Sequence, residues 1–161
     1  MKDKIKTLDE IRSIASNLRK EGKIIVTTNG SFDILHYAHI NLFQKAKKEG
    51  DILIVLLNSD ASIRNNKGPK RPIISQQDRA FILAGLESID YVVIFEEDKP
   101  LKALKEIKPH KHVKGGSFIS DRISEEKELL SSWKGECVYF DLESGFSTTN
   151  IIDKILKAYK D

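Results

Sequence analysis

The hydrophobic residues of this chain switch repeatedly between helical and strand-like spacing along its whole length. Helical spacing predicts helices at residues 8–22, 38–48, 75–85, 99–107, 122–133 and 148–159. Short β-branched or continuously apolar runs predict strands at residues 24–28, 51–57, 91–95, 112–114 and 136–140. Thr7 and Glu10 have the spacing of a capping box at the start of the first helix.

This alternation of strands and helices predicts βαβ units and a parallel sheet that is covered by helices. Such sheets bind ligands beyond the carboxyl ends of their strands, where the strand order reverses. The loops of interest therefore follow Thr28, Leu57, Lys114 and Phe140. Polar residues, glycine and proline predict a long mobile loop over Asn58–Arg71, and we expect it to order over a bound ligand.

Composition narrows the class of protein further. Of the 161 residues, 40% are hydrophobic and 32% are charged, which suits one packed core. The longest apolar run, Ile52–Leu57, is too short to cross a bilayer. A single cysteine, Cys137, cannot form an internal disulfide, and no secretory signal is expected. The net charge of +3 is dispersed except at Lys67–Arg71. We expect a cytoplasmic domain with neither a membrane nor a nucleic acid as its partner.

Two histidines three residues apart, His36 and His39, lie where a predicted helix follows the first predicted strand. Free backbone N–H groups at a helix start favour an anion, and Gly30 would allow close backbone approach. Two imidazoles would add donors for a phosphate whose charge grows as a bond breaks. In isolation such a pair also suits a capping or packing role, and without a third ligand it makes a poor zinc site. The position after the first strand favours phosphate binding.

The sequence resembles the HxGH cytidylyltransferase-like nucleotidyltransferases, and more narrowly the adenylyltransferases of bacterial ADP-heptose synthesis. The resemblance extends from about Gly22 to Ile155. It rests on Thr28–His36, Gly50–Ser62, Lys67–Pro72, Asp78–Arg79, Ile89–Phe95, Val113–Gly116 and Ser147–Thr149. It implies a three-layer α/β/α Rossmann-like nucleotidyltransferase fold with a parallel sheet. The length of the chain predicts one domain over residues 1–161, which we divide into an added N-terminal helix at 1–22 and a catalytic core at 23–161.

The resemblance implies transfer of AMP from ATP to D-glycero-β-D-manno-heptose 1-phosphate, which gives ADP-heptose and pyrophosphate. Mg²⁺ would bridge phosphate oxygens, and no protein cage for the metal is expected. The expected partners are the sugar phosphate, the nucleoside triphosphate and further copies of the chain, with a separate heptose kinase as one source of the sugar phosphate. Two alternatives stay open: a glycerol-3-phosphate cytidylyltransferase, and a nucleotide-binding module with little transfer activity.

The resemblance also implies which residues form the site. Catalytic roles fall on His36, His39 and Lys47, although Lys47 also suits a solvated helix face. Nucleotide-binding roles fall on Asn29, Gly30, Ser31, Phe32, Asn58, Asp60, Arg79, Lys114, Gly115, Gly116, Ser147, Thr148 and Thr149. By itself Arg79 predicts only a surface ion pair. The helix that starts at Ser147–Thr149 would hold the β- and γ-phosphates.

The chain departs from the family pattern at three places. Ala38 stands at the glycine of the signature, and its methyl is expected to point toward the nucleotide. Ser117-Phe118 replaces the usual Asp-Tyr, which removes a carboxylate near the expected acceptor site. Leu142 stands where the glycerol-3-phosphate enzymes have arginine, which counts against that alternative.

Overall fold

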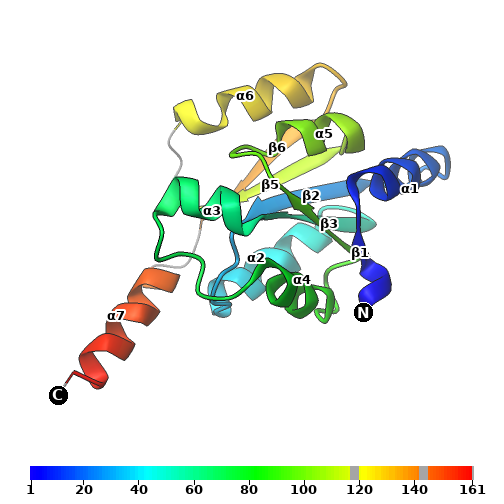
Figure 1. Ribbon diagram of the computed structural model, residues 1–161. Helices are drawn as coiled ribbons and strands as arrows, with labels where there is room; N and C mark the ends of the chain where they lie inside the picture. Colours follow the sequence, from blue (N-terminus) through cyan, green and yellow to red (C-terminus); the bar gives the residue numbers. More distant parts are fainter. Residues whose placement is uncertain (117–119, 142–144, 161) are drawn as a thin grey trace.

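The computed structural model describes residues 1–116, 120–141 and 145–160, and within them one parallel sheet of six strands forms the centre of the molecule (Figure 1). The strand order is β1 (Ile5–Lys6), β4 (Tyr91–Phe95), β3 (Ile52–Asn58), β2 (Ile25–Gly30), β5 (Lys111–Gly115) and β6 (Glu136–Phe140). Strands β3 and β5 pair with opposite sides of β2. The strand order therefore reverses beside β2, the central strand.

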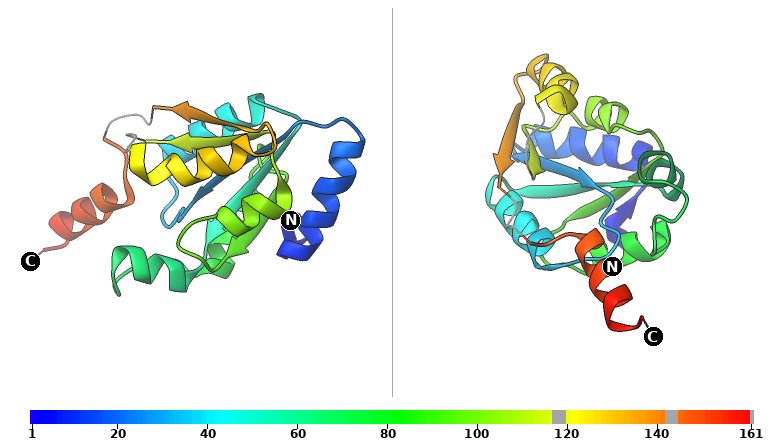
Figure 2. Two further views of the ribbon diagram at one scale, coloured as in Figure 1. Left: turned by 90° about the horizontal axis from the view of Figure 1, so that it is seen from above. Right: turned by 90° about the vertical axis from the view of Figure 1, so that its left-hand side faces the viewer.

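Helices cover both faces of this sheet (Figures 1 and 2). One face carries α1 (Leu8–Lys20), α5 (Leu101–Ile107) and α6 (Ser120–Ser131), and the other carries α2 (Tyr37–Lys48) and α4 (Gln76–Ala84). A short 3₁₀ turn, Lys2–Lys4, precedes β1. The predicted three-layer α/β/α architecture is confirmed. In the described part of the chain, no helix is both long and apolar enough to span a membrane.

Strand β3 shows why the apolar run of the sequence is continuous. Leu53, Val55 and Leu57 are fully buried in the core that includes residues of α2 and α4. Ile54 and Leu56 are fully buried in the second core, with residues of α1 and α5. Successive side chains of a strand point to opposite faces, so a strand with helices on both sides needs no polar positions.

Most element boundaries lie close to their predicted places, and two strands match them in full. Strands β4 and β6 begin and end at the predicted residues. The capping box of α1 is also confirmed, because Thr7 Oγ1 accepts from the N–H of Glu10 and Glu10 Oε2 accepts from the N–H of Thr7. Strand β1 was missed, since two residues in a lysine-rich stretch carry no periodic signal.

The predicted long loop over Asn58–Arg71 is wrong. Helix α3 (Asp60–Lys67) occupies most of that segment and lies at the carboxyl edge of the sheet (Figure 1). Ser59 caps it by accepting from the N–H of Ser62, and the buried Ile63 anchors it. Eight residues with one apolar anchor give too little periodicity to predict a helix. Because most of this segment is a helix, the expectation that a mobile loop orders over a bound ligand has no support.

The last helix, α7 (Thr148–Ala158), extends away from the sheet (Figure 1). Its apolar residues do share one face, as predicted, but none of them is buried. Leu156 is 60% exposed and Tyr159 is 84% exposed. Within the described chain α7 therefore adds little to the core, and its first turn is the part that lies near other elements.

Ala38, in the first turn of α2, is only 2% exposed. Its methyl is therefore enclosed by protein, and the expectation that it points toward a ligand is wrong.

We expect Ala38→Gly to destabilise the protein without helping ligand binding. The substitution removes a buried methyl and adds glycine to a helix, and the helical term alone costs about 1 kcal/mol. Urea denaturation followed by circular dichroism would measure the loss. A variant as stable as the parent would show that the site tolerates the cavity by relaxing.

Candidate active site

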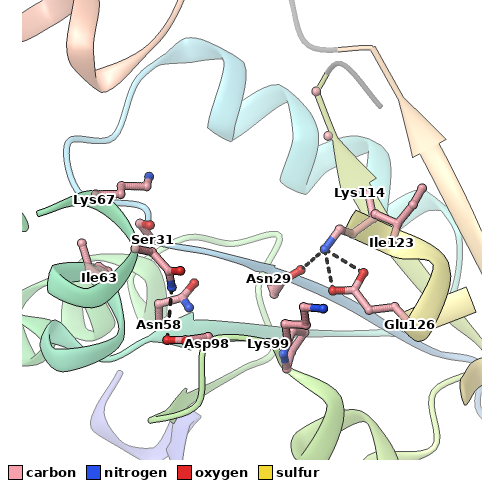
Figure 3. Close-up of a pocket in the computed structure, with 14 residues that line it drawn as sticks. Asn29, Ser31, Asn58, Ile63, Lys67, Asp98, Lys99, Lys114, Ile123 and Glu126 are labelled. Atoms are coloured by element: carbon pink, nitrogen blue, oxygen red, sulfur yellow. Dashed lines mark hydrogen bonds and ion pairs between the residues drawn. The ribbon is translucent and has the colours of Figure 1, made fainter. Parts of the chain in front are cut away.

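A pocket of about 660 Å³, here called the main pocket, opens at the carboxyl edge of the sheet (Figure 3). The ends of β2, β3 and β5 form its floor, and α3 and α6 supply opposite walls. It is lined by Asn29, Ser31, Asn58, Ile63, Asn66, Lys67, Asp98, Lys99, Pro100, Lys114, Gly115, Gly116, Ile123 and Glu126. Three of the four loops singled out from the sequence therefore do meet at one place.

A smaller pocket of about 180 Å³, here called the histidine pocket, adjoins the main pocket. It is lined by Asn29, Gly30, Ser31, Phe32, Asp33, His39, Leu42, Lys67, Lys114, Gly115 and Thr148. Five of these residues, Asn29, Ser31, Lys67, Lys114 and Gly115, also line the main pocket. The two pockets thus form one continuous site along the end of β2.

The two histidines lie against each other at the start of α2. Their ring centroids are 3.7 Å apart and their planes are 22° from parallel. Both Nδ1 atoms are buried and make no hydrogen bond within the described residues. His36 provides the first turn with a backbone carbonyl rather than a side-chain cap. The imidazoles therefore do not cap the helix, and their Nδ1 atoms have no partner among the described residues.

Burial keeps both imidazoles neutral at physiological pH. It lowers the pKa of His36 below its ordinary value of 6.5. Burial, followed by the nearby His36 and Lys67, lowers the pKa of His39 to about 4. Each ring then carries one N–H donor, which can bind a phosphate oxygen without the cost of burying a charge beforehand.

Phe32 is the packing element that places His39. Its ring meets the ring of His39 edge-on at a centroid distance of 5.3 Å and that of Phe43 at 4.9 Å. The same ring covers Gly30, where a Cβ would come within 2.8 Å of Phe32 Cζ. Gly30 is thus required by an aromatic ring, whereas the sequence suggested close approach of a ligand to the backbone.

The start of α7 completes the histidine pocket. Thr148 lines the pocket, and Ser147 caps the helix by accepting from the N–H of Asn150 at 3.0 Å. Free N–H groups of the first turn give a helix start a partial positive charge that favours anions. Thr149 lines neither pocket. The start of α7 was predicted to be a second phosphate-binding helix start. The structure brings it to the histidine pocket, which only Thr148 of the three predicted residues lines.

Lys67 is a site residue that was not predicted from the sequence. It lines both pockets from the end of α3, and no hydrogen bond or ion pair holds its ammonium group within the described parts of the chain. Desolvation, followed by the neighbouring Arg71, lowers the pKa of Lys67. A cation in this position is available to an anionic ligand. Lys67 belongs to the segment Lys67–Pro72, which resembles the family. Because a loop was predicted there, the sequence did not show that Lys67 would face the pocket.

Lys114, in contrast, is already paired. Its Nζ lies 2.7 Å from Asn29 Oδ1 and 3.0 and 2.9 Å from the two carboxylate oxygens of Glu126 (Figure 3). Glu126 comes from α6, whose sequence gave no sign of a site residue. The chain lacks the family's acidic residue at Ser117, which lies outside the described residues, as does Leu142. A carboxylate nevertheless reaches this part of the pocket.

Arg79 lies beneath the site and not on the surface, so the expected surface ion pair is wrong. Its side chain is fully buried and pairs with Asp60 at 2.7 Å. Its guanidinium also donates to the carbonyls of Ile74, Ser31 and Asn58 at 2.9, 2.6 and 2.9 Å. Neither Arg79 nor Asp60 lines the main pocket or the histidine pocket. Arg79 therefore positions the backbone that forms the pocket floor, with Asp60 as its ion-pair partner, and the predicted nucleotide contacts of both residues stay predictions.

Asp33 holds the segment between α3 and α4 in a similar way. Its fully buried carboxylate accepts from Arg71 Nε at 2.6 Å and from the N–H groups of Ile73 and Ile74 at 2.9 Å. Burial alone would raise the pKa of Asp33, but the hydrogen bonds from Ile74, Ile73 and Arg71 outweigh it, and the pKa is lowered. The β2–α2 loop and the basic segment are thereby tied together.

Lys47 is separated from the histidines, so its predicted catalytic role is not supported. Its Nζ donates to the carbonyl of Asp51 at 2.6 Å and pairs with Asp90 at 2.5 Å. It lies near the end of α2, ten residues after Tyr37 and therefore about 15 Å along the helix at 1.5 Å per residue. Lys47 joins elements at the amino edge of the sheet.

Among the described residues, no group of three or more His, Cys, Asp and Glu side chains could hold a metal ion. Mg²⁺ binds through one or two carboxylates together with substrate phosphates in many phosphoryl-transfer sites.

Comparison with known proteins places this architecture in a family. The sequence model described as "Cytidylyltransferase-like" matches residues 27–154. The bifunctional protein HldE of Syntrophotalea carbinolica is 47% identical over 157 residues, which cover 98% of this chain and 32% of the relative. HldE of Geobacter metallireducens is 49% identical over 156 residues, covering 97% and 32%. The chain thus spans about a third of the length of these relatives.

Solved structures agree with this match. A lipopolysaccharide core biosynthesis protein from Thermoplasma volcanium has a TM-score of 0.64 and 29% identity, over 76% of this chain and 98% of its own. A pantoate-β-alanine ligase from Francisella tularensis, complexed with β-γ ATP and β-alanine, has a TM-score of 0.62 over 95% of this chain and 78% of its own. At 17% identity, it shows the fold alone. The predicted resemblance is confirmed: this chain belongs to the cytidylyltransferase-like family of nucleotidyltransferases.

Proposed function

We propose that this domain transfers AMP from ATP to a heptose 1-phosphate, D-glycero-β-D-manno-heptose 1-phosphate, and releases pyrophosphate. The family match, the similarity to the HldE proteins and the similarity to a lipopolysaccharide core biosynthesis protein support this function. The observation that carries the proposal is the stacked pair of half-buried imidazoles, which lies near the starts of α2 and α7 and beside Lys67, a lysine that has no ion-pair partner among the described residues.

The reaction needs no strong base, because the attacking group is already an anion. A phosphate oxygen of the sugar phosphate attacks the α-phosphorus of ATP, and the bond from that phosphorus to the oxygen bridging the α- and β-phosphates breaks. Pyrophosphate leaves with that electron pair. Positioning the two reactants and offsetting the growing negative charge are then the main tasks of the protein.

The residues of the histidine pocket suit these tasks. His36 and His39 would donate N–H groups to the α-phosphate and to the departing pyrophosphate, and Lys67 would offset the charge of both. The start of α7 at Ser147 and Thr148 would hold the β- and γ-phosphates. Because the donors are fixed by packing before the ligand arrives, they lose little free energy to reorganisation during the reaction.

The nucleotide would bring its metal with it. Mg²⁺ bound to the phosphate oxygens would reduce their charge and restrict their geometry. The chain itself would supply the hydrogen bonds around that complex, from the amides of residues 29–32 and from the two helix starts. ATP and Mg²⁺ are therefore proposed as substrate and ion of this domain.

A pyrophosphate-release assay tests the function directly. Each of ATP, CTP, GTP and UTP would be combined with heptose 1-phosphate and, separately, with glycerol 3-phosphate. We expect release only with ATP and heptose 1-phosphate. Release with CTP and glycerol 3-phosphate would instead identify a glycerol-3-phosphate cytidylyltransferase, and nucleotide binding without any release would identify a binding module.

Replacing either histidine should slow the reaction while the fold survives. We expect His36→Ala and His39→Ala each to lower kcat about a hundredfold or more, as is typical when one transition-state donor is removed. Lys47→Met is the control, because that lysine lies at the far end of the same helix. Near-normal rates in both histidine variants would mean that the imidazoles are structural.

The buried state of His39 predicts an unusual titration. Its NMR midpoint in the free protein should lie near the pKa of about 4, against an ordinary 6.5, and ATP should raise it because a phosphate favours the imidazolium. Between a pKa of about 4 in the folded state and 6.5 in the unfolded state, the unfolded state binds more protons than the folded state. The free energy of unfolding should therefore rise with pH across that interval.

His39→Asn should reduce that slope, and urea denaturation at several pH values would measure it. A midpoint near 6.5 in the free protein would contradict the proposed buried, neutral donor.

A further inference from the structure

The ion pair between Lys114 and Glu126 is the least expected feature of the main pocket. The Glu126 side chain is 3% exposed and that of Lys114 is 19% exposed. Removing two such charges from water costs free energy that their attraction recovers only in part, so a buried pair is weak evidence for a stabilising role. Its place in the wall of the pocket indicates a role toward a ligand.

The pair changes what this end of the pocket can bind. Both carboxylate oxygens of Glu126 lie within 3.0 Å of the ammonium group of Lys114, which offsets its charge. A phosphate that approached Lys114 would also approach Glu126, and the two interactions would oppose each other. Lys67 has no such partner among residues 1–116, 120–141 and 145–160, and it lies on the other side of the pocket (Figure 3).

One oxygen of the carboxylate, Glu126 Oε2, is enclosed by protein and accepts no hydrogen bond within the described residues, although Lys114 Nζ lies 2.9 Å from it. Glu126 nevertheless lines the main pocket. It faces the buried ring of His112, whose Nε2 is 3.8 Å away, too far for a hydrogen bond. His112 Nδ1 meets Thr27 Oγ1 at 2.7 Å. Burial, followed by the nearby Lys114, lowers the pKa of His112, so this ring adds no positive charge.

We propose that Glu126 and Lys114, together with Asn29, form a subsite for the hydroxyl groups of a sugar ring. Glu126 accepts from a hydroxyl, while Asn29 and the ammonium of Lys114 position the hydroxyls beside it. The phosphates lie toward Lys67 and the histidines. This inference rests on the proposed function, in which both substrates carry a sugar: ribose in the nucleotide and heptose in the acceptor. The chemistry is the same for either ring.

Calorimetric binding to Glu126→Gln tests the subsite, with Glu128→Gln as the matched control. Glu128 is an exposed residue of the same helix, so that variant makes the same change of charge outside the pocket. The ligands are ATP, 2′-deoxy-ATP, heptose 1-phosphate and inorganic pyrophosphate. We expect Glu126→Gln to weaken a sugar-bearing ligand about tenfold or more, as for loss of a hydrogen bond to a charged group.

The pattern across ligands identifies the ring. If the subsite takes ribose, the variant loses affinity for ATP and no longer distinguishes it from 2′-deoxy-ATP. If it takes heptose, only heptose 1-phosphate binds more weakly. In both cases pyrophosphate should bind as tightly as before or more tightly, because a negative charge has been removed.

Two results would overturn the inference. Unchanged affinity for every sugar-bearing ligand would mean that the pair is structural. Tighter binding of those ligands would mean that Lys114 is a phosphate-binding cation that Glu126 restrains. The double variant Lys114→Met/Glu126→Leu removes both charges and leaves none unpaired, so it tests the same loss of sugar affinity if the single variant folds poorly.

Binding separates this inference from the proposed function. A parent protein that binds ATP through Glu126 but releases no pyrophosphate with heptose 1-phosphate would refute the function and leave the subsite standing. Release of pyrophosphate by a parent whose ligand affinities do not depend on Glu126 would refute the subsite alone.

Discussion

The buried guanidinium of Arg79 is the constraint on which the site depends. It holds the carbonyls of Ser31 and Asn58, which follow or end the two strands beneath the pocket, and the carbonyl of Ile74 from the segment before α4. Loops at the end of a sheet leave carbonyls without ladder partners, and burying such a group unpaired costs about 1–3 kcal/mol. One planar cation with five donors satisfies three of them and the carboxylate of Asp60. The floor of the pocket is thereby fixed without any ligand.

Burial then divides the site by charge. The histidine rings pack against each other and against Phe32, and this packing lowers the pKa of His39 to about 4, so the phosphate-binding donors are neutral before a nucleotide arrives. The half-buried Lys114 is offset by the buried carboxylate of Glu126, whereas Lys67 has no ion-pair partner in the described part of the chain. The ammonium group of Lys67 therefore lies on one side of the main pocket, and the ion pair between Lys114 and Glu126 lies on the other. A ligand with phosphates at one end and hydroxyls at the other fits this distribution.

The elements that could be predicted were those with a local sequence pattern, either a periodic spacing of hydrophobic residues or a capping motif. Strands β4 and β6 and the capping box of α1 follow from local periodicity and side-chain chemistry. The histidine pair could be found because a helix start after a central strand is a recurrent anion site. Helix α3 could not, since its stability comes from one buried isoleucine and a serine cap. Glu126 could not either, because its role depends on α6 reaching the end of β5, and one-dimensional spacing does not show that contact.

Ala38 shows that the effect of a departure from a family pattern depends on where the residue lies in the structure. A methyl at position 38 would crowd the nucleotide only if that position faced the pocket. Successive residues of a helix point in different directions, because the helix turns by about 100° per residue. His36 and His39, three residues apart, lie on one side of the first turn, and Ala38 is enclosed by protein at 2% exposure. The steric demand at this position is thus set by the packing of the helix against its own fold. Alanine at this position also favours the helix by about 1 kcal/mol over glycine. The departure from the family pattern therefore falls on an enclosed position of the helix, apart from the two imidazoles.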